Sequence, residues 1–178
     1  MVYKKQNILD HLHRGSRLKI LIAGIGNKLY SDDGFGPRVI EELTNYGLPP
    51  EVDVIDYGTS VFKALLDMKD YDLVIFVDAI DKGGRAGEIY IIHPLLDQQT
   101  KSNNLRISLH EIDLEKMLKT AKALKVLPKE VIIVGCQPKL LSEGLEISEE
   151  VELAVEEAVA IILKILERKG VLDRKAGC

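Results

Sequence analysis

Acidic residues and one histidine follow the predicted strands of this chain, where the loops of an α/β sheet bind their ligands. Asp33 lies in the loop after the first strand, Asp78 directly follows the third, and His110 precedes the next helix. Carboxylate oxygens and imidazole nitrogens bind divalent metal ions, and two acids with one histidine leave positions open for water or substrate. One hypothesis is therefore an open, three-ligand metal site.

Each of these residues also has an ordinary structural explanation. Asp33 could be the N-cap of a helix, as could Ser31 or Asp32. Asp78 could be a turn residue, and His110 could be a partly buried side chain. Spacing alone favours these structural roles over metal binding.

A dinucleotide site is a second hypothesis, because Gly24 and Gly26 follow a strand and Asp56 ends the next one. The fingerprint fails at its third glycine, where this chain has Leu29. The same loop carries two adjacent aspartates, which would repel a pyrophosphate. The sequence therefore argues against a bound nucleotide.

A nucleophilic hydrolase is a third hypothesis. The chain has no Gly-x-Ser-x-Gly motif, which marks the serine nucleophile of α/β hydrolases. Cys136 could pair with His110, but it stands at the end of an apolar strand. A buried structural thiol is the favoured interpretation of Cys136.

The elements that must position these residues alternate along the chain. Continuous apolar runs predict strands buried on both faces, and apolar side chains at helical spacing predict helices. The predicted strands cover residues 18–23, 52–57, 73–77, 87–93 and 131–135, and the predicted helices cover 37–46, 60–68, 111–125 and 148–168. The short 79–86 connection predicts an antiparallel pair or a sheet edge. The pattern predicts an α/β three-layer sandwich with a mostly parallel five-stranded sheet and helices on both faces.

Composition and charge argue against several classes of protein. The chain has 178 residues and a net charge of −4, which argues against nucleic-acid binding. No apolar run is long enough to cross a membrane, and residues 1–17 lack the apolar middle of a signal peptide. Two cysteines are too few for a disulfide scaffold, so we expect a cytoplasmic protein. We expect one domain over 18–168, after a polar extension at 1–17 and before a tail at 169–178.

Several motifs together resemble those of the nickel–iron hydrogenase maturation endopeptidases. The first is Gly24-Ile25-Gly26-Asn27-x-Leu29-x-x-Asp32-Asp33-Gly34-x-Gly36. The later ones are Asp56-x-Gly58-Thr59, Asp78-Ala79, Ser108-x-His110 and Gly135-x-x-Pro138. The resemblance covers residues 18 to 167, nearly the whole chain.

The resemblance implies a twisted, mainly parallel sheet between helices and a defined activity. Such enzymes remove a C-terminal extension from the precursor of the hydrogenase large subunit after nickel insertion. The resemblance assigns catalytic and metal contacts to Asp33, Asp78 and His110, where relatives often carry Glu at the first position. Asp32, Gly34 and Gly36 shape the loop, and glycine allows backbone angles that other residues avoid. The expected partner is the large-subunit precursor, which would supply the nickel through its own cysteines.

Two mechanisms and one rival function remain open at this point. The enzyme could be metal-dependent, with a water polarised by the metal, or of aspartyl type, with one Asp as general base. The absence of His-Glu-x-x-His disfavours a stably bound catalytic zinc. The rival is a non-catalytic maturation scaffold of the same fold, which would bind nickel or the precursor without cutting.

Overall fold

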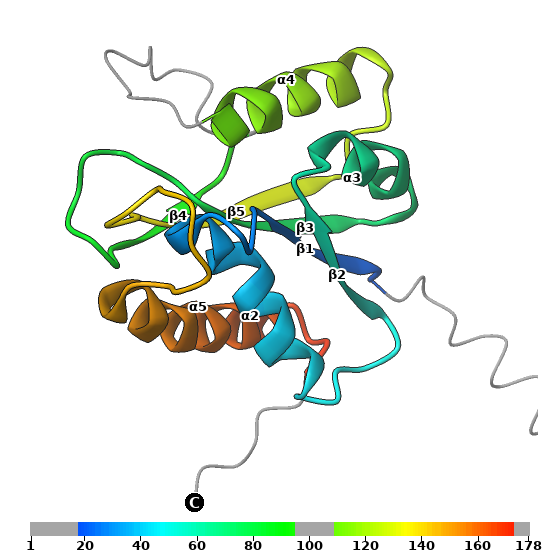
Figure 1. The fold of residues 1–178 in the computed structure, drawn as a ribbon. Coiled ribbons are helices and arrows are strands. Elements are labelled where there is room, and N and C mark those ends of the chain that lie inside the picture. The colour runs from blue at the N-terminus through cyan, green and yellow to red at the C-terminus, as the bar shows by residue number, and fades with distance from the viewer. Residues whose placement is uncertain (1–17, 95–108, 173–178) are drawn as a thin grey trace, which may run out of the picture.

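The computed structural model describes residues 18–94 and 109–172. In this part of the chain, five strands form one sheet in the order β2-β1-β3-β5-β4 (Figure 1). The strands are β1 (Ile20–Ile25), β2 (Val52–Gly58), β3 (Leu73–Ala79), β4 (Ile89–Ile92) and β5 (Glu130–Cys136). The pairs β1–β2, β1–β3 and β3–β5 are parallel, and β4 runs antiparallel to β5. The predicted extension at 1–17 lies outside the described residues.

Helices cover both faces of this sheet. Figure 1 shows α2 and α5 on one face and α3 and α4 on the other. The helices are α2 (Phe35–Thr44), α3 (Val61–Asp67), α4 (Leu109–Ala123) and α5 (Glu149–Arg168), with the short 3-10 turns η1 (Ser31–Gly34) and η2 (Met68–Asp70). The predicted three-layer α/β sandwich is therefore confirmed.

The burial of the strand residues agrees with the central position of the sheet between the helices. Every residue of β1 and β3 is buried, as expected for central strands that are covered on both faces. Their side chains alternate between two cores. Ile22 and Ile75 pack under α2 and α5, whereas Leu21 and Phe76 pack under α3 and α4.

Several boundaries differ from the sequence prediction. The helix predicted at 37–46 spans Phe35–Thr44, so Pro37 is its third residue, where no intrahelical N–H bond is lost. Strand β4 lies at the edge of the sheet, which is one of the two predicted possibilities. Its antiparallel partner is β5, not the preceding β3. No helix in the described residues has the length and hydropathy needed to cross a membrane.

Candidate active site

Asp33 lies in the 3-10 turn η1, between β1 and α2. Its side chain is buried, with 3% of the residue exposed. One carboxylate oxygen accepts a hydrogen bond from the backbone N–H of Asn27 at 2.8 Å, and the Asp33 N–H donates to the Tyr30 carbonyl at 3.1 Å. The N-cap of α2 is Gly34, and no side chain caps that helix. The helix-cap interpretation of Asp33 is therefore wrong, because Gly34 holds the N-cap position.

Asp78 is the penultimate residue of β3 and is completely buried. Alternation along the strand places it on the α3/α4 side, the side to which Phe76 contributes. A carboxylate in such a position is costly to keep without interactions, because burial removes its hydration. The turn interpretation of Asp78 is wrong, since the strand continues through Ala79.

The two aspartates belong to the same edge of the sheet. β1 and β3 are adjacent and parallel, so their carboxyl ends meet there. A Cβ atom on Gly36 would overlap the backbone carbonyls of Ile25 and Val77. The turn that carries Asp33 therefore leads into a helix start that lies directly against the ends of both strands.

His110 is the second residue of α4. The prediction that His110 precedes a helix at 111–125 is wrong, because the helix begins at Leu109. α4 covers the sheet face toward which Asp78 points. The side chain of His110 is outside the described residues, so its convergence with Asp33 and Asp78 stays a prediction. Among the described side chains, no group of three or more potential ligands forms a metal site.

Asp32 organises the loops around the site. It is fully buried, and its carboxylate accepts four hydrogen bonds from a segment more than a hundred residues away in sequence. The donors are the backbone N–H groups of Lys139 (2.8 Å), Leu140 (2.8 Å) and Ser148 (2.7 Å), and the Ser148 hydroxyl (3.0 Å). The predicted loop-shaping role of Asp32 is confirmed, and its partners in 139–148 could not be read from the sequence.

Gln137 holds the loop that follows Asp78 in place by side-chain hydrogen bonds. Sequence reasoning missed this role. Its amide oxygen accepts hydrogen bonds from the N–H groups of Lys82 (2.8 Å) and Gly84 (3.1 Å). Its amide nitrogen donates to Asp81 at 2.8 Å. The available signal was a polar residue directly after a buried strand, beside Pro138 of the last motif.

Cys136 is not a nucleophile in this fold. The residue is completely buried at the end of β5. Burial, with smaller contributions from the negative charges of Asp32 and Glu157, raises the pKa of its thiol to about 12. The thiol therefore stays protonated at neutral pH, which confirms the structural interpretation.

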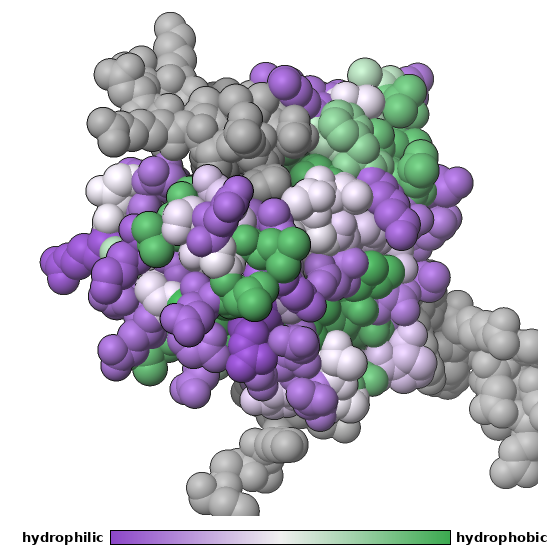
Figure 2. All heavy atoms as spheres, viewed as in Figure 1, coloured by the Kyte–Doolittle hydropathy of each residue, from purple (hydrophilic) through white to green (hydrophobic). Residues whose placement is uncertain are grey.

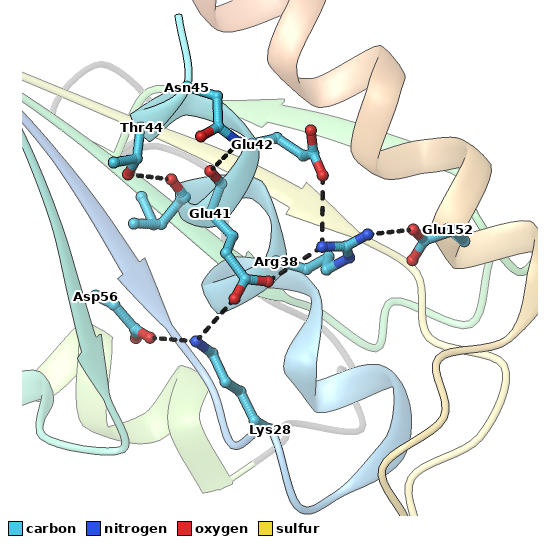
Figure 3. A network of polar contacts seen from close by, with 9 residues as sticks. Lys28, Arg38, Glu41, Glu42, Thr44, Asn45, Asp56 and Glu152 are labelled. Carbon is cyan, nitrogen blue, oxygen red and sulfur yellow. Dashed lines mark hydrogen bonds and ion pairs between the residues drawn. The ribbon is translucent and has the colours of Figure 1, made fainter.

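A surface network of ion pairs connects the loop after β1 with β2, α2 and α5 (Figure 3). Lys28 contacts Asp56 at 3.2 Å and Glu41 at 3.9 Å. Arg38 contacts Glu41 at 3.1 Å and Glu152 of α5 at 3.1 Å. Asp56, the ribose ligand of the dinucleotide hypothesis, is thus paired with a lysine of the first motif.

The fold is that of a family of peptide hydrolases. The family model for HycI, described as hydrogenase maturation protease, matches residues 37–165. This chain belongs to the hydrogenase maturation protease family.

Individual relatives agree with that membership. A putative hydrogenase maturation protease of Methanocaldococcus jannaschii is 38% identical over 151 residues, which cover 81% of this chain and 94% of the relative. The solved hydrogenase maturating endopeptidase HybD of Escherichia coli superposes with a TM-score of 0.76 at 31% identity, covering 86% of this chain and 94% of that one. A hydrogenase 2 maturation peptidase from a Thaumarchaeota archaeon is 40% identical, with a TM-score of 0.65 and coverages of 84% and 98%.

Proposed function

We propose that this protein is the endopeptidase that removes a C-terminal extension from the nickel-loaded precursor of a nickel–iron hydrogenase large subunit. The observation that carries the proposal is the pair of buried aspartates, Asp33 and Asp78, at one edge of the sheet in a member of the maturation protease family. Two fixed carboxylates at a ligand-binding edge can supply both metal contacts and proton transfer.

Nickel enters this proposal as part of the substrate. Carboxylate oxygens and an imidazole nitrogen are suitable ligands for Ni²⁺. Asp33 is held in place by the Asn27 N–H, and Asp78 is held within β3. These two residues, with His110, would contact the nickel in the precursor and so fix which peptide bond lies next to them. The loaded metal would then be the signal that the precursor is ready to be cut.

Hydrolysis of the bound peptide requires an activated water and a proton for the leaving amine. A carboxylate next to the scissile bond can take the proton from the attacking water and return it to the amine nitrogen. The metal, when present, supplies polarisation of that water. Asp33 and Asp78 are the candidates for the proton transfer, and both routes remain compatible with their positions.

The proposal also explains how a protease can act in the cytoplasm without general damage. Cutting would need the metal-loaded substrate to complete the site, which makes the substrate part of its own specificity. The partner is therefore a folded protein precursor that presents an extended C-terminal chain.

The test is the intact mass of a large-subunit precursor after incubation with this protein, with and without nickel loading. We expect loss of one C-terminal fragment from the loaded precursor only. The variants Asp33→Asn, Asp78→Asn and His110→Ala should each lower the cleavage rate at least 100-fold, about 2.7 kcal/mol of barrier. Asp70→Asn, which changes an exposed acid in η2, is the matched control.

The outcomes separate the proposal from its rival. Capture of the loaded precursor without any cleavage would show a binding scaffold instead of an endopeptidase. Full cleavage by His110→Ala would remove that residue from the metal contacts. Equal cleavage of loaded and nickel-free precursors would remove nickel from the recognition step.

A further inference from the structure

Three leucines project from two loops that are hydrogen-bonded to one another beside Asp33. Leu29, Leu140 and Leu145 are 64%, 53% and 75% exposed, and we call these three residues the leucine patch. Single exposed leucines are common on protein surfaces and need no explanation. These three leucines come from neighbouring backbone segments, and clustered exposed apolar side chains are typical of interaction sites.

The two loops hold the leucine patch in one arrangement. The Gly144 N–H donates to the Leu29 carbonyl at 3.0 Å, and the Ser31 N–H donates to the Gly144 carbonyl at 2.8 Å. The Asp32 carboxylate adds hydrogen bonds to the segment that carries Leu140. A surface fixed in this way loses little conformational entropy when a partner binds.

The leucine patch continues into a hollow next to the candidate active site. This hollow, of about 220 Å³, is lined by Lys28, Gly34, Arg38, Glu41, Leu145 and Ile147. Gly34 directly follows Asp33 in the chain. The hollow therefore lies beside the turn that carries Asp33, and Leu145 forms part of its wall.

Exposed glutamates border the leucine patch, beside Lys28, Arg38 and Lys139, each of which is already ion-paired to an acid. Glu143, Glu146 and Glu149 are exposed and lie between or just beyond the loop leucines in sequence. Within the part of the chain that the structure describes, these three glutamates form no ion pairs, whereas nearby Glu150 is neutralised by Lys139 at 2.7 Å. Figure 2 shows hydrophobic atoms surrounded by hydrophilic ones on the face of the molecule where α2 and the segment before α5 lie.

We infer that the leucine patch and its three glutamates form the docking surface for the precursor. The segment that binds there carries an apolar side chain flanked by lysine or arginine and lies next to the cleaved bond. Its apolar part contacts Leu145 and enters the hollow, and its positive charges face the unpaired glutamates. This inference rests on the proposed function for the identity of the partner.

The experiment measures the dissociation constant of the nickel-loaded precursor by rapid-mixing fluorescence anisotropy, before cleavage proceeds. Leu145→Ser should weaken binding about tenfold, because it removes a central apolar contact. The double variant Glu143→Lys, Glu146→Lys should weaken binding about tenfold at low salt. Added salt should weaken wild-type binding but not that of the double variant.

Matched controls lie on the opposite side of the sheet. Leu66→Ser changes a leucine that is 69% exposed on α3, and Asp70→Lys reverses an exposed charge on η2. Both should bind the precursor as the wild type does. Circular dichroism of all variants checks that they are folded.

The results distinguish this inference from the proposed function. Wild-type protein that binds through this surface but never cuts would leave the docking surface intact and overturn the endopeptidase. If the wild type cuts normally, and Leu145→Ser and the double variant bind with unchanged affinity, the docking surface alone is overturned. Failure of the wild type to bind would overturn both. A wild-type dimer that Leu145→Ser converts to monomers would assign the leucine patch to a second copy of this chain, against the inference.

Discussion

Replacement of Asp32 by alanine is the sharpest test of how this site is held together. The change leaves three buried or half-buried backbone N–H groups and one hydroxyl without their acceptor. Hydrogen bonds to a charged group contribute about 1.5 to 3 kcal/mol each, so simple addition gives an upper bound of about 6 to 12 kcal/mol. Water can reach the opened space beside exposed Leu140, and the losses are not additive. We therefore expect Asp32→Ala to lower the free energy of unfolding by about 3 to 5 kcal/mol.

Urea denaturation and thermal melting measure this loss. For a domain of this size, each kcal/mol corresponds to roughly 2 to 4 °C, so the melting temperature should fall by about 10 °C. Amide hydrogen exchange at Lys139, Leu140 and Ser148 should accelerate first, because these groups lose their acceptor. Asp70→Ala, at an exposed position, should change stability by less than about 0.5 kcal/mol. A loss below about 1 kcal/mol for Asp32→Ala, with unchanged exchange, would refute this account of the loop.

Three further perturbations test the packing and the charges around the site. Gly36→Ala should lower the free energy of unfolding by more than about 3 kcal/mol in urea titration, because its Cβ would overlap two strand carbonyls. Gly34→Ala is the control: its Cβ would make only ordinary contacts, so this variant should melt like the wild type. Gln137→Ala should cost about 2 to 4 kcal/mol and speed amide exchange in the loop after Asp78, since that loop loses the amide oxygen that accepts its N–H groups. The pKa of the Cys136 thiol is raised from 9.0 to about 12 by folding, so the free energy of unfolding should fall as pH rises between those values. In a Cys178→Ser background, alkylation at pH 8 should therefore require unfolding.

Much of the fold could be predicted from the sequence because buried parallel strands are continuous apolar runs. The 18–23 run and the 73–77 run correspond to β1 and β3, which are covered on both faces. Boundaries were less predictable where polar residues extend an element. Asp78 lies inside β3, because pairing with β5 continues through Ala79, and α4 begins at Leu109, two residues before the predicted start.

The partners of polar side chains were the part that sequence could not supply. Asp32 could be recognised as a loop residue, but its acceptor role depends on segment 139–148, which the fold brings beside it. The amide of Gln137 likewise binds a loop some fifty residues earlier in the chain. Local propensity holds no information about such distant pairs, so they emerge only once the sheet order is known.

The two adjacent aspartates show how one turn can serve both structure and chemistry. Consecutive side chains of a 3-10 turn point about 120° apart, because the turn has three residues per rotation. Asp32 therefore binds segment 139–148, while the Asp33 carboxylate accepts a hydrogen bond from the Asn27 N–H. Asp32 organises the proposed docking loops, and Asp33 is proposed to act on the substrate. These two acids are adjacent in the chain. A shift of that turn would displace both together, so formation of the docking surface and alignment of Asp33 depend on the same buried carboxylate.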